Sequence, residues 1–184
     1  MQNNLFIISG PSGAGEDSII NGLVKRGVDL ERVITTTSRD KRSGEKDGEP
    51  YYFIRKKEFK LKIENNDFFE WAEEYGNYYG VTQSEIERVK NLNKIGIWKM
   101  GYKGVRTAKK LLPNIKSILI NAPLNQIENR IRTRDKNVTE QFIEDRMEYT
   151  KEWLKHISLY DYVVMNLDGR LNQAVEEVFQ ILKK

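Results

Sequence analysis

The sequence predicts an α/β protein built on an open, mostly parallel sheet of five strands with helices on both faces. Short apolar runs of strand length alternate with segments of helical periodicity along most of the chain, which is the pattern of a parallel sheet buried on both sides. A length of 184 residues fits one domain and is sufficient to bury a core. The content of 39% hydrophobic and 32% charged residues is typical of a globular protein.

Five apolar runs are the candidate sheet strands, and the segments between them carry the helical pattern. We expect strands at residues 5–9, 32–37, 94–100, 116–122 and 161–166. We expect helices at residues 17–26, 83–92, 103–112, 124–134, 139–156 and 170–183. Asn125, Thr139 and Asn172 are candidate caps or first-turn residues, because short polar side chains accept hydrogen bonds from the free N–H groups at a helix start.

Two segments interrupt the alternation. Residues 38–82 begin polar and turn-rich and then become aromatic, which indicates a small lobe of short strands inserted between the second and third sheet strands. A basic stretch at about 130–146 joins two helices and is a candidate lid. Both are expected outside the carboxyl ends of the strands, where ligands of such sheets bind. We therefore interpret residues 1–184 as one domain with a core at 1–37 and 83–184.

The composition excludes several classes of function. The chain has no cysteine and one histidine, His156, so disulfides, thiol catalysis and a histidine-based metal site are not expected. No apolar run reaches the roughly 20 residues of a membrane helix, and the first residues lack leader features. We expect a cytoplasmic protein without a membrane partner. The basic run RKKEFKLK at 55–62 lacks interleaved stacking aromatics, so a nucleic-acid partner is not expected either.

The stretch GPSGAGEDS directly after the first strand has the form of a phosphate-binding loop. Its glycines allow backbone N–H groups to surround phosphates, and the following helix offers its positive N-terminal end. The lysine of such loops is replaced by Glu16, and the first hydroxyl of the usual pair is replaced by Asp17, whereas Ser18 keeps its hydroxyl. Two interpretations stay open, an ordinary helix start or an altered nucleotide loop in which Asp17 and Ser18 coordinate Mg²⁺. The candidate ATP-binding residues are Gly10, Pro11, Ser12, Gly13, Ala14, Gly15, Glu16, Asp17 and Ser18.

Four motifs in order carry a resemblance to a known family. They are GPSGAG, then TTTSRDKRSGEKDGEPYYF with an R-x-x-R-x-G-E core, then FFEWAEEYGNYYG, and finally YDYVVMN. Over essentially its whole length the chain resembles guanylate kinase. The resemblance implies a P-loop kinase fold, with an inserted lobe that binds GMP and a short lid. It also implies phosphoryl transfer from ATP to GMP with Mg²⁺ as the metal, a reaction that depends on positioning and charge neutralisation.

The resemblance also assigns the acceptor site. Guanidinium forks and tyrosine hydroxyls suit a phosphate, and Glu70 matches the position that accepts hydrogen bonds from guanine. Two positions depart from the family: Val81 stands where a serine or threonine is usual, and Gly101 replaces the second aspartate of a D-x-D motif. These departures leave the guanine preference open. The candidate GMP-binding residues are Thr35, Arg39, Arg42, Glu45, Tyr51, Glu70, Tyr79, Val81 and Gly101.

A charge swap is a further hypothesis at the donor side. The loop lysine is replaced by Glu16, and the first acidic position of the D-x-D motif is replaced by Lys99. The Lys99 ammonium could therefore either pair with Glu16 or reach a phosphate from the opposite wall of the site. By resemblance, lid arginines contact the ATP phosphates and the transferred group, and Asn166 matches an adenine-side position. The candidate catalytic residues are Arg42, Lys99, Arg134 and Arg146, with Arg130 and Asn166 as further ATP-binding residues.

Two functions from different classes remain open from sequence alone. One is an active guanylate kinase that uses MgATP and GMP with an altered loop. The other is a catalytically impaired module that uses the monophosphate cage to hold GMP or a phosphorylated ligand. The sequence does not fix the oligomeric state.

Overall fold

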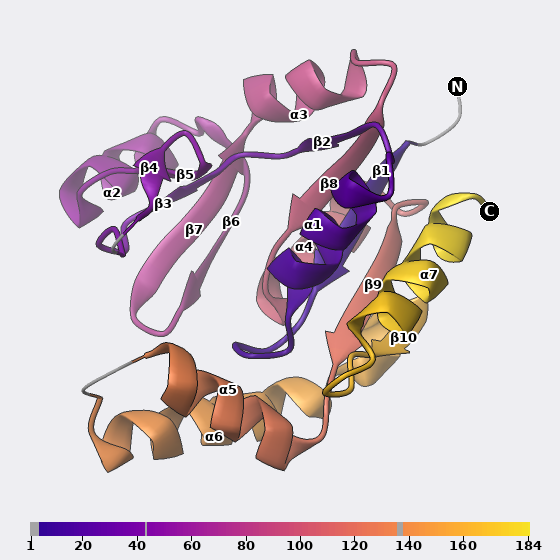
Figure 1. The fold of residues 1–184 in the computed structure, drawn as a ribbon. Helices are drawn as coiled ribbons and strands as arrows, with labels where there is room; N and C mark the ends of the chain where they lie inside the picture. Colours follow the sequence, from indigo (N-terminus) through magenta and orange to yellow (C-terminus); the bar gives the residue numbers. More distant parts are fainter. Residues whose placement is uncertain (1–3, 43, 136–137) are drawn as a thin grey trace. The chain divides into compact units, whose positions relative to one another are not determined.

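The computed structural model describes residues 4–42, 44–135 and 138–184. Its larger sheet has five strands in the order β10-β9-β1-β8-β2 and is flanked by helices (Figure 1). The pairs β10–β9 and β2–β8 are parallel, which confirms the predicted fold class. The strands are β1 (Leu5–Ser9), β2 (Leu30–Arg32), β8 (Ile95–Lys99), β9 (Lys116–Asn121) and β10 (Tyr162–Met165).

The helices expected from periodicity are present. Thr139 is the N-cap of α6, and its side chain accepts a hydrogen bond from the Phe142 N–H. Asn125 and Asn172 lie in the first turns of their helices. The helices are α1 (Glu16–Lys25), α3 (Gln83–Lys90), α4 (Tyr102–Leu111), α5 (Leu124–Arg134), α6 (Glu140–Leu154) and α7 (Leu171–Leu182), with a short 3₁₀ turn at Ile157–Leu159.

A second sheet of five strands is formed within residues 35–82, in the order β4-β5-β3-β7-β6, so it begins slightly before the predicted insertion at 38–82. The same segment also contains helix α2 (Lys56–Glu64), which was not predicted from the sequence. This helix holds most of the basic run, and it buries only Phe59, which stacks on Phe68 with a centroid distance of 4.3 Å. The strands are β3 (Thr35–Thr37), β4 (Lys46–Asp47), β5 (Pro50–Phe53), β6 (Phe68–Glu74) and β7 (Asn77–Thr82).

The single strand predicted at residues 32–37 is wrong, because the chain changes sheets within it. β2 ends at Arg32 in the larger sheet, and β3 begins at Thr35 in the second sheet. Between them the Ile34 N–H donates to the buried carboxylate of Glu85, 2.7 Å away, instead of to a strand. A side-chain acceptor on α3 thus ends the ladder at this crossing.

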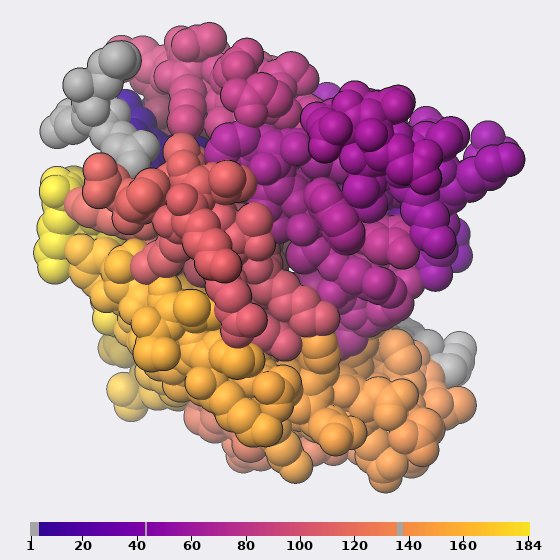
Figure 2. All heavy atoms as spheres, turned by 180° about the vertical axis from the view of Figure 1, so that it is seen from behind, coloured from indigo at the N-terminus to yellow at the C-terminus, as the bar shows by residue number. Residues whose placement is uncertain are grey.

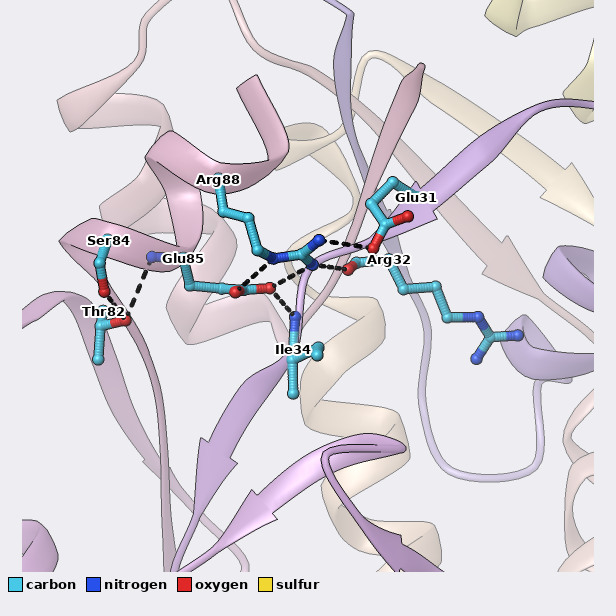
Figure 3. A network of polar contacts seen from close by, with 7 residues as sticks. All are labelled: Glu31, Arg32, Ile34, Thr82, Ser84, Glu85 and Arg88. Carbon is cyan, nitrogen blue, oxygen red and sulfur yellow. Dashed lines mark hydrogen bonds and ion pairs between the residues drawn. The ribbon is translucent and has the colours of Figure 1, made fainter. Parts of the chain in front are cut away.

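Arg88 completes this crossing by neutralising the buried carboxylate. Its guanidinium donates to Glu85 at 2.9 Å, to Glu31 at 2.7 Å and to the Arg32 carbonyl at 3.1 Å (Figure 3). A buried carboxylate needs such partners to stay ionised. The network therefore fixes α3 to the point where the chain leaves the larger sheet.

The chain divides into two compact units. One contains residues 29–115 with the beginning of β1, and the other contains residues 7–28 and 116–184. In the second unit α1 packs on α7, where Gly22 allows a close approach because an added Cβ would overlap Val175. The candidate GMP-binding residues and the candidate catalytic residue Lys99 lie in the first unit, and the candidate ATP-binding residues lie in the second. Within the described ranges, none of the helices has the length and apolarity needed to cross a membrane.

Candidate active site

The acceptor cage is organised around the guanidinium of Arg39. Its Nη2 donates to both carboxylate oxygens of Glu45, at 2.8 and 2.9 Å. Glu45 also accepts from the Arg42 N–H at 2.7 Å. Burial alone would raise the pKa of Glu45, but these hydrogen bonds hold it below its usual value. Arg39 is therefore kept charged and oriented.

Two tyrosines and a second cation, Lys99, lie close to the Arg39 guanidinium or to the Tyr51 ring beside it. The Arg39 guanidinium lies 5.5 Å from the Tyr51 ring centroid, and the Lys99 ammonium lies 5.5 Å from the same ring. The rings of Tyr51 and Tyr79 meet edge to face at 6.2 Å. Burial and the neighbouring Tyr51 raise the pKa of Tyr79, so its hydroxyl remains a neutral donor. Two cations and two phenols together can bind a phosphate dianion.

Thr35 is buried on β3 and pairs in register with Tyr51 on β5. Thr35 thus lies on the strand that supports the cage. The structure brings together Thr35, Arg39, Glu45, Tyr51, Tyr79 and Lys99.

The base end of the acceptor site contains a buried carboxyl group. Glu70 on β6 is 5% exposed, and burial, reinforced by the charge of Glu74, raises its pKa to about 8. Val81 pairs with Glu70 across β6 and β7 and is fully buried. The neighbouring Thr82 hydroxyl caps α3 by accepting from the Glu85 N–H. The Thr82 hydroxyl is therefore used in capping α3 and does not replace the hydroxyl that position 81 lacks.

Gly101 is the N-cap of α4 and has an ordinary extended backbone, with φ of −81°. A Cβ added there would overlap the carboxylate of Glu74, a buried residue of β6. The sequence reading missed Glu74. Alternation along β6 from Glu70 would have placed both side chains on one face, which is a signal that was available.

The phosphate-binding loop has the conformation that its glycines permit. Gly13 and Gly15 have φ of 92° and 98°, which other residues rarely adopt. The Ala14 N–H donates to the Pro11 carbonyl at 2.9 Å. The Glu16 carboxylate turns back and accepts from the Gly15 N–H at 3.1 Å. An acidic side chain thus contacts a loop amide of the kind that binds phosphate in such loops.

Asn166 and Arg130 hold the outer side of this loop. The buried Asn166 amide donates to the Ala14 carbonyl at 2.8 Å. Arg130 donates to the carbonyls of Gly13 and Ala14 at 3.2 and 3.3 Å and forms an ion pair with Asp168. Asp168 was not singled out in the sequence, because nothing in its local pattern indicates this long-range pair. The contacts of Asn166 and Arg130 fix the loop backbone.

The remaining lid arginines differ in what they contact. Arg134 donates to the Ser12 hydroxyl at 3.0 Å and forms an ion pair with Asp135, so its guanidinium lies at the loop with a carboxylate beside it. Arg146 stacks on Phe142, with its guanidinium carbon 4.9 Å from the ring centroid. Arg132, which has no matching family position, forms ion pairs with Glu128 and Glu140 on the lid surface. Residues 136 and 137 of the predicted lid lie outside the described residues.

The residues proposed for Mg²⁺ lie in the first turn of α1, where the side chains of Asp17 and Ser18 are exposed. Within residues 4–42, 44–135 and 138–184, no group of three or more histidine, cysteine or acidic side chains could hold a metal ion. Mg²⁺ commonly binds through one or two protein oxygens together with substrate phosphates and water. The exposed carboxylate and hydroxyl fit that mode of binding.

A glycine-rich loop between β1 and α1 of a parallel sheet, together with a phosphate cage on an inserted lobe, defines a P-loop kinase fold. The family model of guanylate kinase matches residues 2–184. The chain belongs to the guanylate kinase family.

Curated and solved relatives agree with this assignment. The chain is 35% identical to a guanylate kinase of Pseudoalteromonas translucida, covering 91% of this chain and 81% of that protein. It is 37% identical to a guanylate kinase of Bartonella henselae, covering 96% and 79%. The crystal structure of a guanylate kinase from Anaplasma phagocytophilum superposes with a TM-score of 0.75 at 22% identity, covering 97% and 84%, and supports the fold.

Proposed function

We propose that this protein catalyses transfer of the terminal phosphoryl group of MgATP to GMP, giving ADP and GDP. Membership of the guanylate kinase family supports this reaction, as do the names of the curated relatives. The observation that carries it is the cage of Arg39, Tyr51 and Tyr79, with Lys99 beside Tyr51. The relatives give no specific support to the non-catalytic alternative.

The phosphate of GMP must be bound in a fixed position before its oxygen can attack the terminal phosphoryl group of ATP. Arg39, oriented by Glu45, presents its fork to the phosphate oxygens, and the phenols of Tyr51 and Tyr79 donate to the same group. The Arg39 guanidinium is already held by Glu45 and by the Asp40 carbonyl, so its position is fixed before the phosphate arrives. The cage thereby holds the attacking oxygen in one position, which is the main requirement of phosphoryl transfer.

Lys99 supplies the ammonium that the phosphate loop lacks. It lies at the end of β8 and contacts the ring of Tyr51 in the acceptor cage. We infer that it neutralises the negative charge that develops on the phosphoryl group during the transfer. Negative charge spreads over the phosphoryl oxygens in the transition state, so a fixed cation there lowers the barrier.

The donor triphosphate binds at the loop between β1 and α1. Its phosphates take the loop N–H groups and the N-terminal end of α1, and so displace the Glu16 carboxylate from the Gly15 N–H. Arg134, at Ser12, adds positive charge from the lid. Asp17 and Ser18 would hold Mg²⁺, which when bound neutralises the phosphates of ATP.

We also propose a metabolic role and a cellular location for this reaction. Conversion of GMP to GDP is a step of purine nucleotide metabolism, and we assign it to the cytoplasm because its nucleotide substrates are found there.

A coupled assay of GMP-dependent ADP formation tests the proposed function. We expect turnover with MgATP and GMP in the protein as it stands, and much less with AMP or UMP. Absence of turnover in the parent, together with turnover in Glu16→Lys, would show that the loop is disabled on an intact scaffold. Absence in both would overturn the assignment of the reaction.

A further inference from the structure

Two buried carboxyl groups line the N-terminal end of α4. Glu70 is 5% exposed and Glu74 is 8% exposed, and both belong to β6. Glu74 is four positions after Glu70, an even number, so the two side chains share a face of the strand. α4 packs on β6, and its outer surface is visible beside the β6–β7 strands (Figure 2). Two acidic side chains are thus enclosed between one strand and one helix start.

Glu70 has an unsatisfied oxygen. Within the part of the chain that the structure describes, its Oε1 has no hydrogen-bond partner, although the side chain is almost fully buried. A Cβ added at Gly104 would lie 3.0 Å from this atom, so the first turn of α4 leaves just enough room for it. A buried acceptor without a donor costs free energy, and a ligand with N–H groups relieves that cost.

Glu74 explains why position 101 is glycine. The φ of Gly101 is −81°, so its backbone does not require glycine. A side chain there is excluded because its Cβ would overlap the Glu74 carboxylate. Glu74 therefore occupies the space that a side chain at position 101 would fill, and it brings a carboxylate to that place from a different strand.

We propose that Glu74 is a specificity-determining residue of the acceptor site, which together with Glu70 accepts the N–H donors of the acceptor base. The base that fits is a purine with a ring N–H and an adjacent exocyclic amino group, as in guanine. A carboxylate contributed from β6 takes the place of a side chain at position 101. This inference rests on the proposed function, because it assigns the acceptor site to a nucleoside monophosphate.

A purely structural role for Glu74 predicts a different outcome. A carboxylate beside the N-cap of α4 also stabilises the positive end of that helix. Removing it would then lower thermal stability, and any good N-cap at position 101 would restore the loss. Base recognition instead requires a negatively charged acceptor at that place.

Equilibrium titration of GMP and IMP separates the two roles without depending on turnover. IMP lacks the exocyclic amino group. We expect Glu74→Ala to weaken GMP binding by about 10- to 100-fold, in line with the loss of hydrogen bonds to a charged group, and to weaken IMP binding much less. Glu73→Ala is the matched control, since Glu73 is the exposed neighbour on the opposite face of β6, and it should change neither affinity.

Two second-site variants complete the test. Gly101→Asp in the Glu74→Ala background should recover most of the GMP affinity, whereas Gly101→Ser, a neutral N-cap, should recover melting temperature alone. Equal recovery of GMP affinity by serine, or equal loss of GMP and IMP binding in Glu74→Ala, would overturn the proposal. If GMP binds and responds in this way but ADP formation is absent, the proposed function fails while this inference stands.

Discussion

The acceptor cage and the phosphate-binding loop differ in how they obtain positive charge. In the cage, the cation Arg39 is held by a carboxylate and surrounded by phenols. In the loop, the residue that follows the last glycine is Glu16, and its carboxylate contacts a loop amide. Each site therefore contains one of the protein's own carboxylates, Glu45 beside a cation in the cage and Glu16 beside an amide in the loop, and the loop at residues 10–18 has no cation of its own. Charge at the donor side must therefore come from residues outside the loop.

The phosphate-binding loop of this protein has the backbone form of such loops, but its side-chain charges differ from theirs. The loop glycines retain positive φ, and Asn166 and Arg130 still fix the loop carbonyls. Lys99 is found in the acceptor cage. Glu74 occupies the place of a side chain at position 101. Variants of Lys99 and Glu74 test whether these two charges carry function.

Substitution of Lys99 is expected to have the largest effect on turnover. Lys99→Ala should lower kcat for GMP phosphorylation by about 10²- to 10³-fold, the usual result of removing a group that stabilises transition-state charge. Steady-state kinetics with MgATP and GMP provides the measurement. Lys103→Ala is the matched control, because the Lys103 ammonium contacts the Glu73 carbonyl, and it should change kcat less than about twofold. An unchanged kcat in Lys99→Ala would remove the lysine from the mechanism.

The acceptor cage should respond mainly in substrate affinity. Arg39→Ala should raise the KM for GMP by about 10- to 100-fold, because a charge-assisted hydrogen bond to phosphate is lost. The KM for ATP should stay within about twofold. Arg55→Ala, on the exposed start of α2, controls for general loss of positive charge. A rise in the KM for ATP that equals the rise for GMP would contradict separate sites.

Glu70, at the end of the acceptor site that is expected to bind the base, should make GMP affinity depend on pH. The pKa of Glu70 is raised to about 8 by burial and by Glu74, and guanine's N–H donors require the ionised form. GMP affinity should therefore rise about tenfold between pH 7 and 9 and level off above the pKa. The phosphate of GMP is already doubly charged over this range. Isothermal titration across this range measures the effect, and a flat profile would show that Glu70 is ionised before binding.

Glu74 should set the position of this pH profile. In Glu74→Gln the negative charge that raises the pKa of Glu70 is lost, so the rise in affinity should move to lower pH. Other titratable groups on elements packed against β6 include Tyr79 on β7, Glu85 and Arg88 on α3, and Lys103 on α4. Tyr79 has a raised pKa and stays neutral in this range. A profile that does not move in Glu74→Gln would contradict the coupling of the two carboxyl groups.

The smallest expected effect concerns the loop scaffold. Asn166→Ala removes a buried hydrogen bond to the Ala14 carbonyl and should lower the free energy of unfolding by about 1–3 kcal/mol. This corresponds to a melting temperature lower by roughly 2–10 °C. Thermal unfolding measures it, with Asn125→Ala on the exposed start of α5 as the control. The KM for ATP should rise with the loss of loop order, and a change confined to GMP would contradict this role.

Sequence patterns predicted the features that depend on local residues. The alternation of apolar runs gave the parallel sheet, and glycine spacing gave the phosphate loop. The crossing at residues 32–37 was read as one strand, because the carboxylate that ends it, Glu85, lies about fifty residues later. Alternation along β6 was a local signal for the face on which the Glu74 side chain lies, but its closeness to Gly101 on another element was not. Long-range side-chain contacts of this kind leave no local periodicity.

We infer that Lys99 supplies the ammonium that phosphoryl transfer needs and that position 16 lacks. A double-mutant cycle on kcat with Glu16→Lys and Lys99→Asp tests it most directly. We expect Lys99→Asp to abolish most turnover in the parent but to be tolerated in the Glu16→Lys background, with a coupling free energy of at least about 1.5 kcal/mol. Additive effects of the two changes would contradict it.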